Sequence, residues 1–336
     1  MAPALRRHRL PRSGKLALSL RASVMGRTGS DALVPWLAER LGVKLLARRP
    51  LGGGCIHSAW RLELEGGGCL FAKTNRAEAL ALLEAEADGL AALAAVADPS
   101  RLTVPQPLAL GLVGEQAVLV LPWLELEAGG RNVADWERFG ASLAGLHQRS
   151  LAAAAAPHDR GDGSFGWGRD NVIGTTPQGN GWCRDWGRFF AERRLAPQLA
   201  LLARSGPALA GAEALLERVP AWLSGHGAVP ALVHGDLWSG NAGLCGERLG
   251  ALFDPAVHRA DREVDLAMAR LFGGFPPRFF AGYERAWPLP AGHQQRRPLY
   301  NLYHLLNHAN LFGGAYRQQA QQTIEVLLGQ GLDGGA

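Results

Sequence analysis

The chain contains little cysteine: four residues, Cys55, Cys69, Cys183 and Cys245, in a total of 336. They lie far apart and form no Cys-x-x-Cys pair, which excludes the usual cysteine-based zinc sites and a disulfide framework. Sparse, unpaired cysteine is typical of proteins from a reducing compartment. We therefore expect a cytoplasmic protein.

The chain also lacks a long apolar run. The longest candidates, residues 117–124 and 151–156, fall well short of the roughly 18 apolar residues that a membrane helix needs. We expect no membrane span. No segment repeats with a period of about 20 to 50 residues, which excludes a solenoid or a propeller.

Acidic residues are absent from residues 1–30, which hold seven basic ones, while the other 306 residues hold 28 basic and 30 acidic ones. The formal charge of +5 therefore comes from this terminal segment, and a nucleic-acid partner is not expected. The segment has no uninterrupted apolar core of the kind that targeting peptides carry. We interpret it as a disordered basic tail, or as an over-extended gene start with Met25 as the true first residue.

The hydrophobic pattern changes near residue 124. Before it, short alternating runs predict strands at 45–51, 59–65, 69–74, 108–112 and 117–121, and one helix at 78–95. After it, three- and four-residue spacing predicts helices at 134–148, 184–204, 208–224, 261–272 and 298–328. A small β-rich lobe over 31–124 and a larger helical lobe over 125–330 predict an α+β, protein-kinase-like fold.

The segment His-Gly-Asp-Leu-Trp-Ser-Gly-Asn at 234–241, followed by Phe-Asp-Pro at 253–255, carries the strongest chemical signal. Phosphoryl transfer needs a carboxylate to orient or deprotonate the attacking hydroxyl, and oxygen ligands to hold Mg²⁺ against the nucleotide phosphates. The spacing predicts Asp236 as the catalytic base, and Asn241 and Asp254 as metal ligands. The alternative is an Asx-rich turn between two strands, without catalytic meaning.

A nucleotide site is predicted in the first lobe. Gly52, Gly53 and Gly54 lie between two predicted strands, and Lys73 closes a later one. Glycines let backbone N–H groups approach phosphate oxygens, and a lysine on an adjacent strand neutralises their charge. A hairpin turn explains a triple glycine as well, and the Gly-x-Gly-x-x-Gly pattern is absent.

Lys73 needs an acidic partner, which the following helix offers in Glu78, Glu84, Glu86 and Asp88. We favour Glu86. Between the lobes, Leu121 and Trp123 belong to a segment whose backbone would meet the adenine of ATP.

Several longer segments resemble the fructosamine/ketosamine kinase family over about residues 34–328. They are GGGCIH at 52–57, LEAEADGL at 83–90, VPQPLALG at 104–111, FGWGRDNVIGTTPQGNGW at 165–182, WGRFFAERRLAPQLALL at 186–202, HGDLWSGN at 234–241, FDPAVHRADREVDLAM at 253–268 and YNLYHLLNHANLFGG at 300–314. The resemblance implies an ATP- and Mg²⁺-dependent kinase that phosphorylates the 3-hydroxyl of a ketose linked to an amine. The phosphorylated adduct is unstable and releases the amine, so repair of glycation products or metabolism of free ketosamines is expected.

The resemblance also suggests substrate contacts. Trp238 could stack on a sugar ring or pack the floor of its loop. Asp170, Asn171 and Gln178 could line a polyol pocket, or simply hold an irregular loop together. Cys55, in the glycine-rich loop, could act as a redox switch.

Two further residues near the catalytic segment have structural interpretations. We expect Asp265 to bind backbone N–H groups of the catalytic loop, and His234 to orient it. Gly235 replaces the arginine that reads a phosphorylated activation loop in protein kinases, and Pro255 replaces a mobile Phe-Gly. The site is therefore expected to be built constitutively.

Two rival functions stay open. One is a related kinase for aminoglycosides, choline or homoserine, against which the segment at 165–182 argues. The other is a pseudokinase that only binds nucleotide or ketosamine, against which the presence of Lys73, Asp236, Asn241 and Asp254 argues. The protein is expected to be a monomer or a homodimer.

Overall fold

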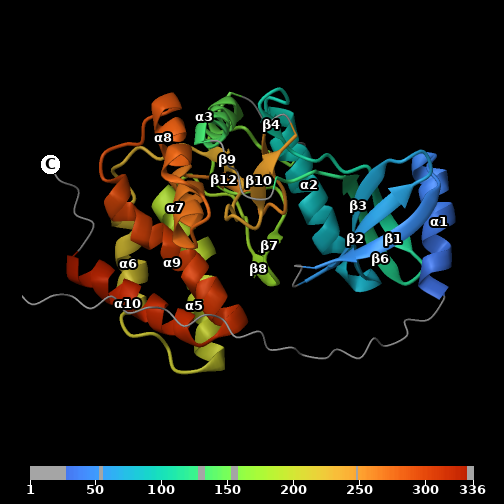
Figure 1. Cartoon of the computed structure of the whole chain (residues 1–336). Helices are drawn as coiled ribbons and strands as arrows, with labels where there is room; N and C mark the ends of the chain where they lie inside the picture. Colours follow the sequence, from blue (N-terminus) through green and yellow to red (C-terminus); the bar gives the residue numbers. More distant parts are fainter. Residues whose placement is uncertain (1–27, 53–55, 128–132, 153–157, 247–248, 331–336) are drawn as a thin grey trace, which may run out of the picture.

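The computed structural model describes residues 28–52, 56–127, 133–152, 158–246 and 249–330, arranged as two lobes (Figure 1). Helix α1 (Thr28–Leu41) begins inside the segment interpreted above as a tail. The rest of that segment, together with Gly53, Gly54 and Cys55, lies outside the described residues.

The smaller lobe is built on one antiparallel sheet, whose strands follow the order β1-β2-β3-β6-β5. The strands are β1 (Leu45–Leu51), β2 (Ser58–Leu64), β3 (Cys69–Arg76), β5 (Ala109–Val113) and β6 (Gln116–Pro122). Each agrees with a strand predicted from the sequence to within two residues. The predicted helix is present as a short 3₁₀ turn, η1 (Ala77–Ala79), and α2 (Leu80–Val96).

Strand β6 shows why this sheet has a helix on each face. Val118 and Val120 pack in one cluster with Leu33 and Leu37 of α1. The alternating residues of the same strand pack with α2 on the other face. Successive side chains of a strand point to opposite faces, so the apolar run of β6 buries both. Helix α1 was not predicted.

The larger lobe is mainly helical. Its helices are α3 (Val133–Ser150), α4 (Trp186–Phe189), the π-helical η2 (Phe190–Leu195), α5 (Ala196–Ser205), α6 (Ala212–Trp222), α7 (Glu263–Leu271), α8 (Pro277–Ala286), α9 (His293–Phe312) and α10 (Ala315–Gln330). The helix predicted at 184–204 contains the π-helical segment, and the one predicted at 298–328 is two helices. The break between these two falls at Gly313 and Gly314, whose φ angles of +64° and +57° favour glycine.

Short strands lie between these helices. The pairs are β9 (Ala231–Val233) with β12 (His258–Ala260), β7 (Asn171–Ile173) with β8 (Thr176–Gln178), and β10 (Ala242–Cys245) with β11 (Leu249–Leu252). Strand β4 (Leu102–Thr103) follows α2 along the chain but pairs in parallel with β11. Residues 102–103 therefore belong to the larger lobe, although they precede the boundary predicted near residue 124.

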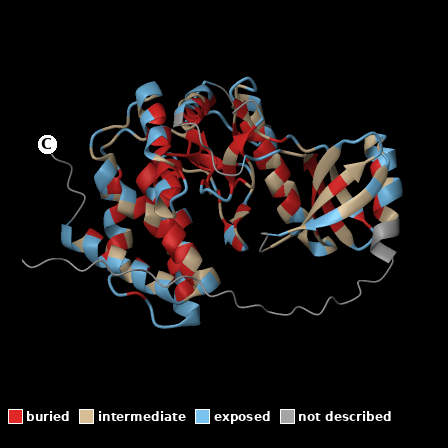
Figure 2. Cartoon of the chain, in the orientation of Figure 1, coloured by how far each residue is buried: buried red, intermediate tan, exposed pale blue. Residues whose placement is uncertain are grey.

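The segment through β12 and α7 is buried without interruption over residues 255–269, at the centre of the larger lobe (Figure 2). It follows directly on Asp254, so the predicted metal loop rests on the most enclosed part of the fold. None of the described helices is long and apolar enough to cross a membrane.

Candidate active site

The catalytic loop follows β9 and is held by one buried carboxylate. Asp265 of α7 accepts hydrogen bonds from the backbone N–H groups of His234, at 2.7 Å, and Gly235, at 2.9 Å. His147 of α3 contacts the same carboxylate, with 3.2 Å between Nε2 and Oδ2. Burial alone would raise the pKa of Asp265, but the hydrogen bond and charge of His147, with smaller effects from His234 and Gly235, hold it below its ordinary value. The predicted structural role of Asp265 is thereby confirmed.

His234 orients the loop through both ring nitrogens. Its Nδ1 accepts from the Asp236 backbone N–H at 3.2 Å, and its Nε2 donates to the Phe253 carbonyl at 2.9 Å. Burial lowers the pKa of His234, so the ring stays neutral and can make both bonds. The ring thus ties Asp236 to the strand that leads to Asp254.

Gly235 occupies a position that only glycine fits. Its φ is +80°, and a Cβ there would lie 2.1 Å from the carbonyl oxygen of Ala256. An arginine would have the same clash, so the departure from the protein-kinase pattern has a steric reason.

Asp236 and Asn241 face each other across the loop. Asn241 Nδ2 donates to Asp236 Oδ2 and to the Asp236 carbonyl, both at 3.0 Å. Burial raises the pKa of Asp236 to about 7, although the hydrogen bond from Asn241 acts in the opposite direction. A carboxyl group with such a pKa can accept a proton near neutral pH.

Lys73 of β3 joins the two lobes. Its Nζ lies 2.8 Å from Glu86 Oε1 and 2.5 Å from Asp254 Oδ1. Burial alone would lower the pKa of Lys73, but the two carboxylates outweigh it and raise the pKa, so the ammonium stays charged. Glu86, the favoured one of the four acidic candidates, is the residue that the structure pairs with Lys73.

Asp254 has an unusual backbone. Its φ of +57° is the only positive value among the described residues other than glycine, and its side chain is 42% exposed. Strained backbone of this kind is characteristic of functional positions. Because Lys73 of the smaller lobe pairs with it, the carboxylate lies where the two lobes meet.

The donor set fits Mg²⁺. Within the described part of the chain, every side-chain hydrogen bond of Asn241 is donated by Nδ2. Its Oδ1 receives no hydrogen bond there and is available to a metal ion. That amide oxygen and the Asp254 carboxylate are the hard oxygen ligands that Mg²⁺ prefers, and Lys73 already places a cation on Asp254.

The other described residues that were predicted to bind the nucleotide differ in how exposed they are. Gly52 is exposed at the end of β1. The side chain of Leu121 belongs to the buried cluster under α2, so only its backbone could meet a nucleotide. Trp123 is half-buried beneath the Arg61 guanidinium, which lies 4.9 Å from its ring centroid.

The predicted substrate residues fall into two groups. Trp238 is 39% exposed, and its ring covers Gly240, where a Cβ would lie 2.3 Å from the indole. Asp170 is also exposed and accepts from the Asn180 backbone N–H at 2.7 Å. Both remain candidates for substrate contact.

Asn171 and Gln178 belong to the other group, since both are buried in the β7-β8 hairpin. Asn171 Nδ2 donates to the Val257 carbonyl at 2.9 Å, and Gln178 Nε2 donates to Asn171 Oδ1 at 2.7 Å and to the Ala256 carbonyl at 3.2 Å. Both amides therefore form hydrogen bonds with the backbone just after Asp254. This burial argues against direct contact with a substrate and favours a supporting role.

Sequence reasoning missed the residues that complete this network. Tyr303 of α9 donates to Gln178 Oε1 at 2.6 Å, and Arg194 of η2 donates to Asn180 Oδ1 at 2.6 Å. Burial lowers the pKa of Arg194 to about 10. Neither residue lies near its partner in the sequence, so no local pattern points to the contact.

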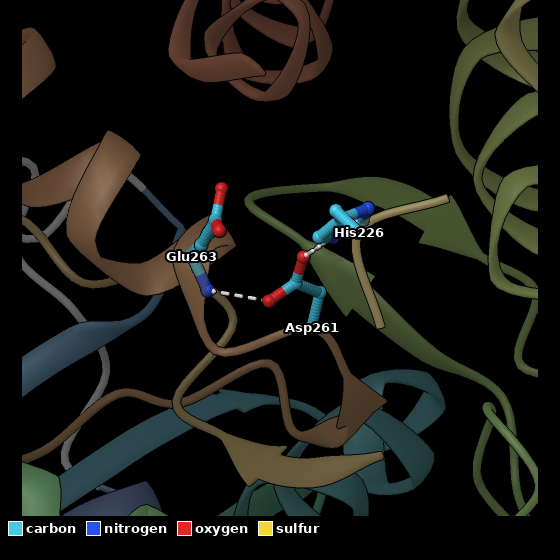
Figure 3. Close-up of side chains that lie close together, drawn as sticks. All are labelled: His226, Asp261 and Glu263. Carbon is cyan, nitrogen blue, oxygen red and sulfur yellow. Dashed lines mark hydrogen bonds and ion pairs between the residues drawn. The ribbon is translucent and has the colours of Figure 1, made fainter. Parts of the chain in front are cut away.

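A second cluster of possible metal ligands consists of His226, Asp261 and Glu263, which lie close together (Figure 3). His226 Nε2 lies 2.5 Å from Asp261 Oδ2, which also accepts from the Tyr300 hydroxyl at 2.7 Å. Both oxygens of Glu263 accept from Arg296, at 3.0 and 2.7 Å. Because His226 Nε2 and both carboxylates are already paired, we interpret the cluster as a structural network at the start of α7.

Comparisons with known proteins agree with this geometry. The family model described as fructosamine kinase matches residues 32–330. A Synechocystis sp. protein named as a probable ketoamine kinase is 43% identical over 285 residues, which make up 85% of this chain and 91% of the relative. The chloroplastic protein-ribulosamine 3-kinase of Oryza sativa subsp. indica is 34% identical over 328 residues, 96% of this chain and 90% of the relative.

Solved structures show the same fold. A Haemophilus somnus protein described as a putative fructosamine-3-kinase superposes with a TM-score of 0.77 at 27% identity, covering 89% of this chain and 97% of that one. An aminoglycoside phosphotransferase has a TM-score of 0.57 at 18% identity, covering 89% and 99%, a likeness of fold alone. The predicted two-lobed, protein-kinase-like fold is confirmed.

Proposed function

The chain belongs to the fructosamine kinase family, and we propose that it transfers a phosphoryl group from ATP to the 3-hydroxyl of a ketosamine. The observation that carries the proposal is the convergence of Lys73, Asp236, Asn241 and Asp254 at one place between the lobes. The names of the ketoamine and ribulosamine kinase relatives support the substrate class.

Asp236 is the group that receives the proton of the substrate hydroxyl. Asn241 occupies Oδ2, which leaves the other carboxylate oxygen for the substrate, and burial keeps the pKa close to neutral pH. A base positioned in this way contributes about a hundredfold or more to the rate.

Asn241 and Asp254 would hold Mg²⁺, and Lys73 would contact the phosphates of ATP from β3. The metal supplies positive charge to the phosphate oxygens during transfer. Glu86 keeps the ammonium of Lys73 in place, because its carboxylate is only 10% exposed and lies at ion-pair distance. Gly52 lies at the edge of the loop expected to cover the phosphates.

The biological consequence follows from the product. A phosphate on the 3-hydroxyl destabilises the sugar adduct, so the amine is released and the substrate is deglycated. Fructosamines and ribulosamines, free or on protein lysines, are the candidate substrates. Free thiols at Cys69, Cys183 and Cys245 support a reducing, cytoplasmic location.

The test is an ADP-release assay with Mg-ATP and a panel of fructosyl-, ribulosyl- and erythrulosyl-lysine, with choline and an aminoglycoside as competing substrate classes. We expect turnover on ketosamines only, reduced at least about a hundredfold in Asp236→Asn. Turnover confined to choline or the aminoglycoside would show a different small-molecule kinase. Nucleotide binding without turnover on any substrate would show a pseudokinase.

A further inference from the structure

Helix α2 carries Glu86, yet its two halves are buried in different lobes. Leu83, Ala87 and Leu90 pack on the sheet of the smaller lobe. Ala92 and Leu93 belong to a core cluster of the larger lobe, which also contains Trp167 and Val257. The helix is therefore fixed to both lobes, and its place in the site depends on its contacts with the larger one.

The most specific of these contacts is a hydrogen bond from Trp167. Its indole Nε1 donates to Asp88 Oδ2 at 2.8 Å, and the tryptophan is 2% exposed. Asp88 lies two positions after Glu86, on the side of the helix that faces the larger lobe. Arg169, at 3.5 Å from Glu84, makes a second and more exposed contact from the same segment.

Backbone hydrogen bonds of Trp167 and its neighbour fix the position of the indole. Gly166 exchanges two backbone hydrogen bonds with Arg259 of β12, at 2.9 and 2.8 Å, and the Trp167 N–H donates to the Asn180 carbonyl at 2.8 Å. The φ of Gly166 is +126°, and a Cβ there would lie 2.6 Å from the Asn180 carbonyl oxygen. The indole position is thus set by the strand that follows the metal loop.

Gly89 provides a third contact, directly against that loop. A Cβ at Gly89 would lie 3.2 Å from Val257 and 3.3 Å from Pro255, the residue after Asp254. Glycine inside a helix is unfavourable by itself, and here it allows the close approach. Helix α2 therefore packs directly against the chain that follows Asp254.

We propose that Trp167 and Asp88 are positioning residues that clamp α2 and thereby set how Lys73 is shared between Glu86 and Asp254. Lys73 contacts both carboxylates. If α2 moves away, Glu86 withdraws and the ammonium remains on Asp254, where it competes with Mg²⁺. The clamp therefore governs affinity for the magnesium nucleotide, an inference that rests on the proposed kinase function.

The experiment measures Mg-ADP binding by calorimetry, with amide hydrogen exchange of α2 as a second readout. Trp167→Phe keeps an aromatic ring but removes the donor, and Asp88→Leu removes the acceptor. Asp88→Asn is the matched variant, because its amide oxygen can still accept from the indole. Ala91→Ser, at an exposed position of the same helix, is the control.

We expect Trp167→Phe and Asp88→Leu to weaken Mg-ADP binding by about three- to tenfold, the effect of losing one buried hydrogen bond. Exchange of the α2 amides should accelerate relative to the sheet. Asp88→Asn and Ala91→Ser should stay within about twofold of the unaltered protein. A merely structural defect would reduce the number of binding sites per chain and leave the dissociation constant of the remaining sites unchanged.

Unchanged dissociation constants in both Trp167→Phe and Asp88→Leu would overturn the proposal, and so would Asp88→Asn binding as weakly as Asp88→Leu. If either damaging variant fails to fold, Gly89→Ala replaces it, since alanine favours the helix while its methyl group presses on Pro255 and Val257. No ketosamine is involved in these measurements. A wrong substrate class would therefore leave them intact, and absent nucleotide binding in the unaltered protein would count against the kinase function itself.

Discussion

Removing the charge of Asp236 should stabilise the protein while destroying its activity. The carboxyl group is half-buried in the folded protein, and Asn241 is the one hydrogen-bond donor to it among the described residues. Asp236→Asn keeps the shape of the side chain and an oxygen that can accept from Asn241. The variant therefore resembles the protonated, uncharged form of the enzyme.

The magnitude follows from the pKa, which burial raises from 3.8 to about 7 in the folded state. The stability penalty is absent below the unfolded pKa, grows as the pH rises between the two values, and is constant above about 7. Three pH units at about 1.36 kcal/mol each give an upper bound of about 4 kcal/mol at pH 8. At pH 5 only about 1.5 kcal/mol of this remains.

The assay is urea denaturation of the unaltered protein and of Asp236→Asn at pH 5 and pH 8, with chelator present and no nucleotide. We expect the variant to be more stable by about 2 to 4 kcal/mol at pH 8 and by clearly less at pH 5. Asp254→Asn is the matched control, because that carboxylate is 42% exposed and paired with Lys73, so no gain is expected. A stability gain for Asp236→Asn that is absent, or equal at both pH values, would refute the reasoning.

Three more predictions follow from the same contacts. The kcat/KM of ADP release should rise through about pH 7 as Asp236 loses its proton, and a pH–rate profile flat from 5 to 9 would contradict this. Tyr303→Phe should lower the free energy of unfolding by about 1 to 3 kcal/mol in urea titrations, because Gln178 Oε1 is left buried without a donor; an unchanged midpoint would exclude this cost. Trp238→Leu should raise the KM for the ketosamine several-fold with the KM for ATP unchanged, and equal changes in both would assign the indole to the loop instead.

The sequence was a good guide wherever the chemistry is local. The spacing of Asp236, Asn241 and Asp254 predicted side chains that the structure brings together, and the strands of the smaller lobe appear where alternation placed them. The structural interpretation of Asp265 also succeeded. A carboxylate one turn into a helix after the metal loop has few partners other than the loop backbone.

The sequence was a poor guide where partners lie far apart along the chain. Asn171 and Gln178 have the planar amides that read sugars, but the same amides can satisfy buried backbone carbonyls, and only the fold shows which. Tyr303 lies 125 residues from Gln178 along the chain, and Arg194 lies 14 residues from Asn180, with α4 between them. Helix α1 was missed as well, and Pro35 inside it works against a helical pattern.

Helix α2 shows that more could have been extracted from the pattern itself. Glu84 and Asp88 are four residues apart and so share one face of the helix, whereas Glu86 points to the opposite side. That side is the apolar stripe of Leu83 and Leu90, which packs on the sheet that carries Lys73. A lone carboxylate on an apolar stripe needs a buried cation, while the pair on the other face is free to contact a second lobe. The helical period alone therefore distinguishes the partner of Lys73 from the residues that hold the helix in place.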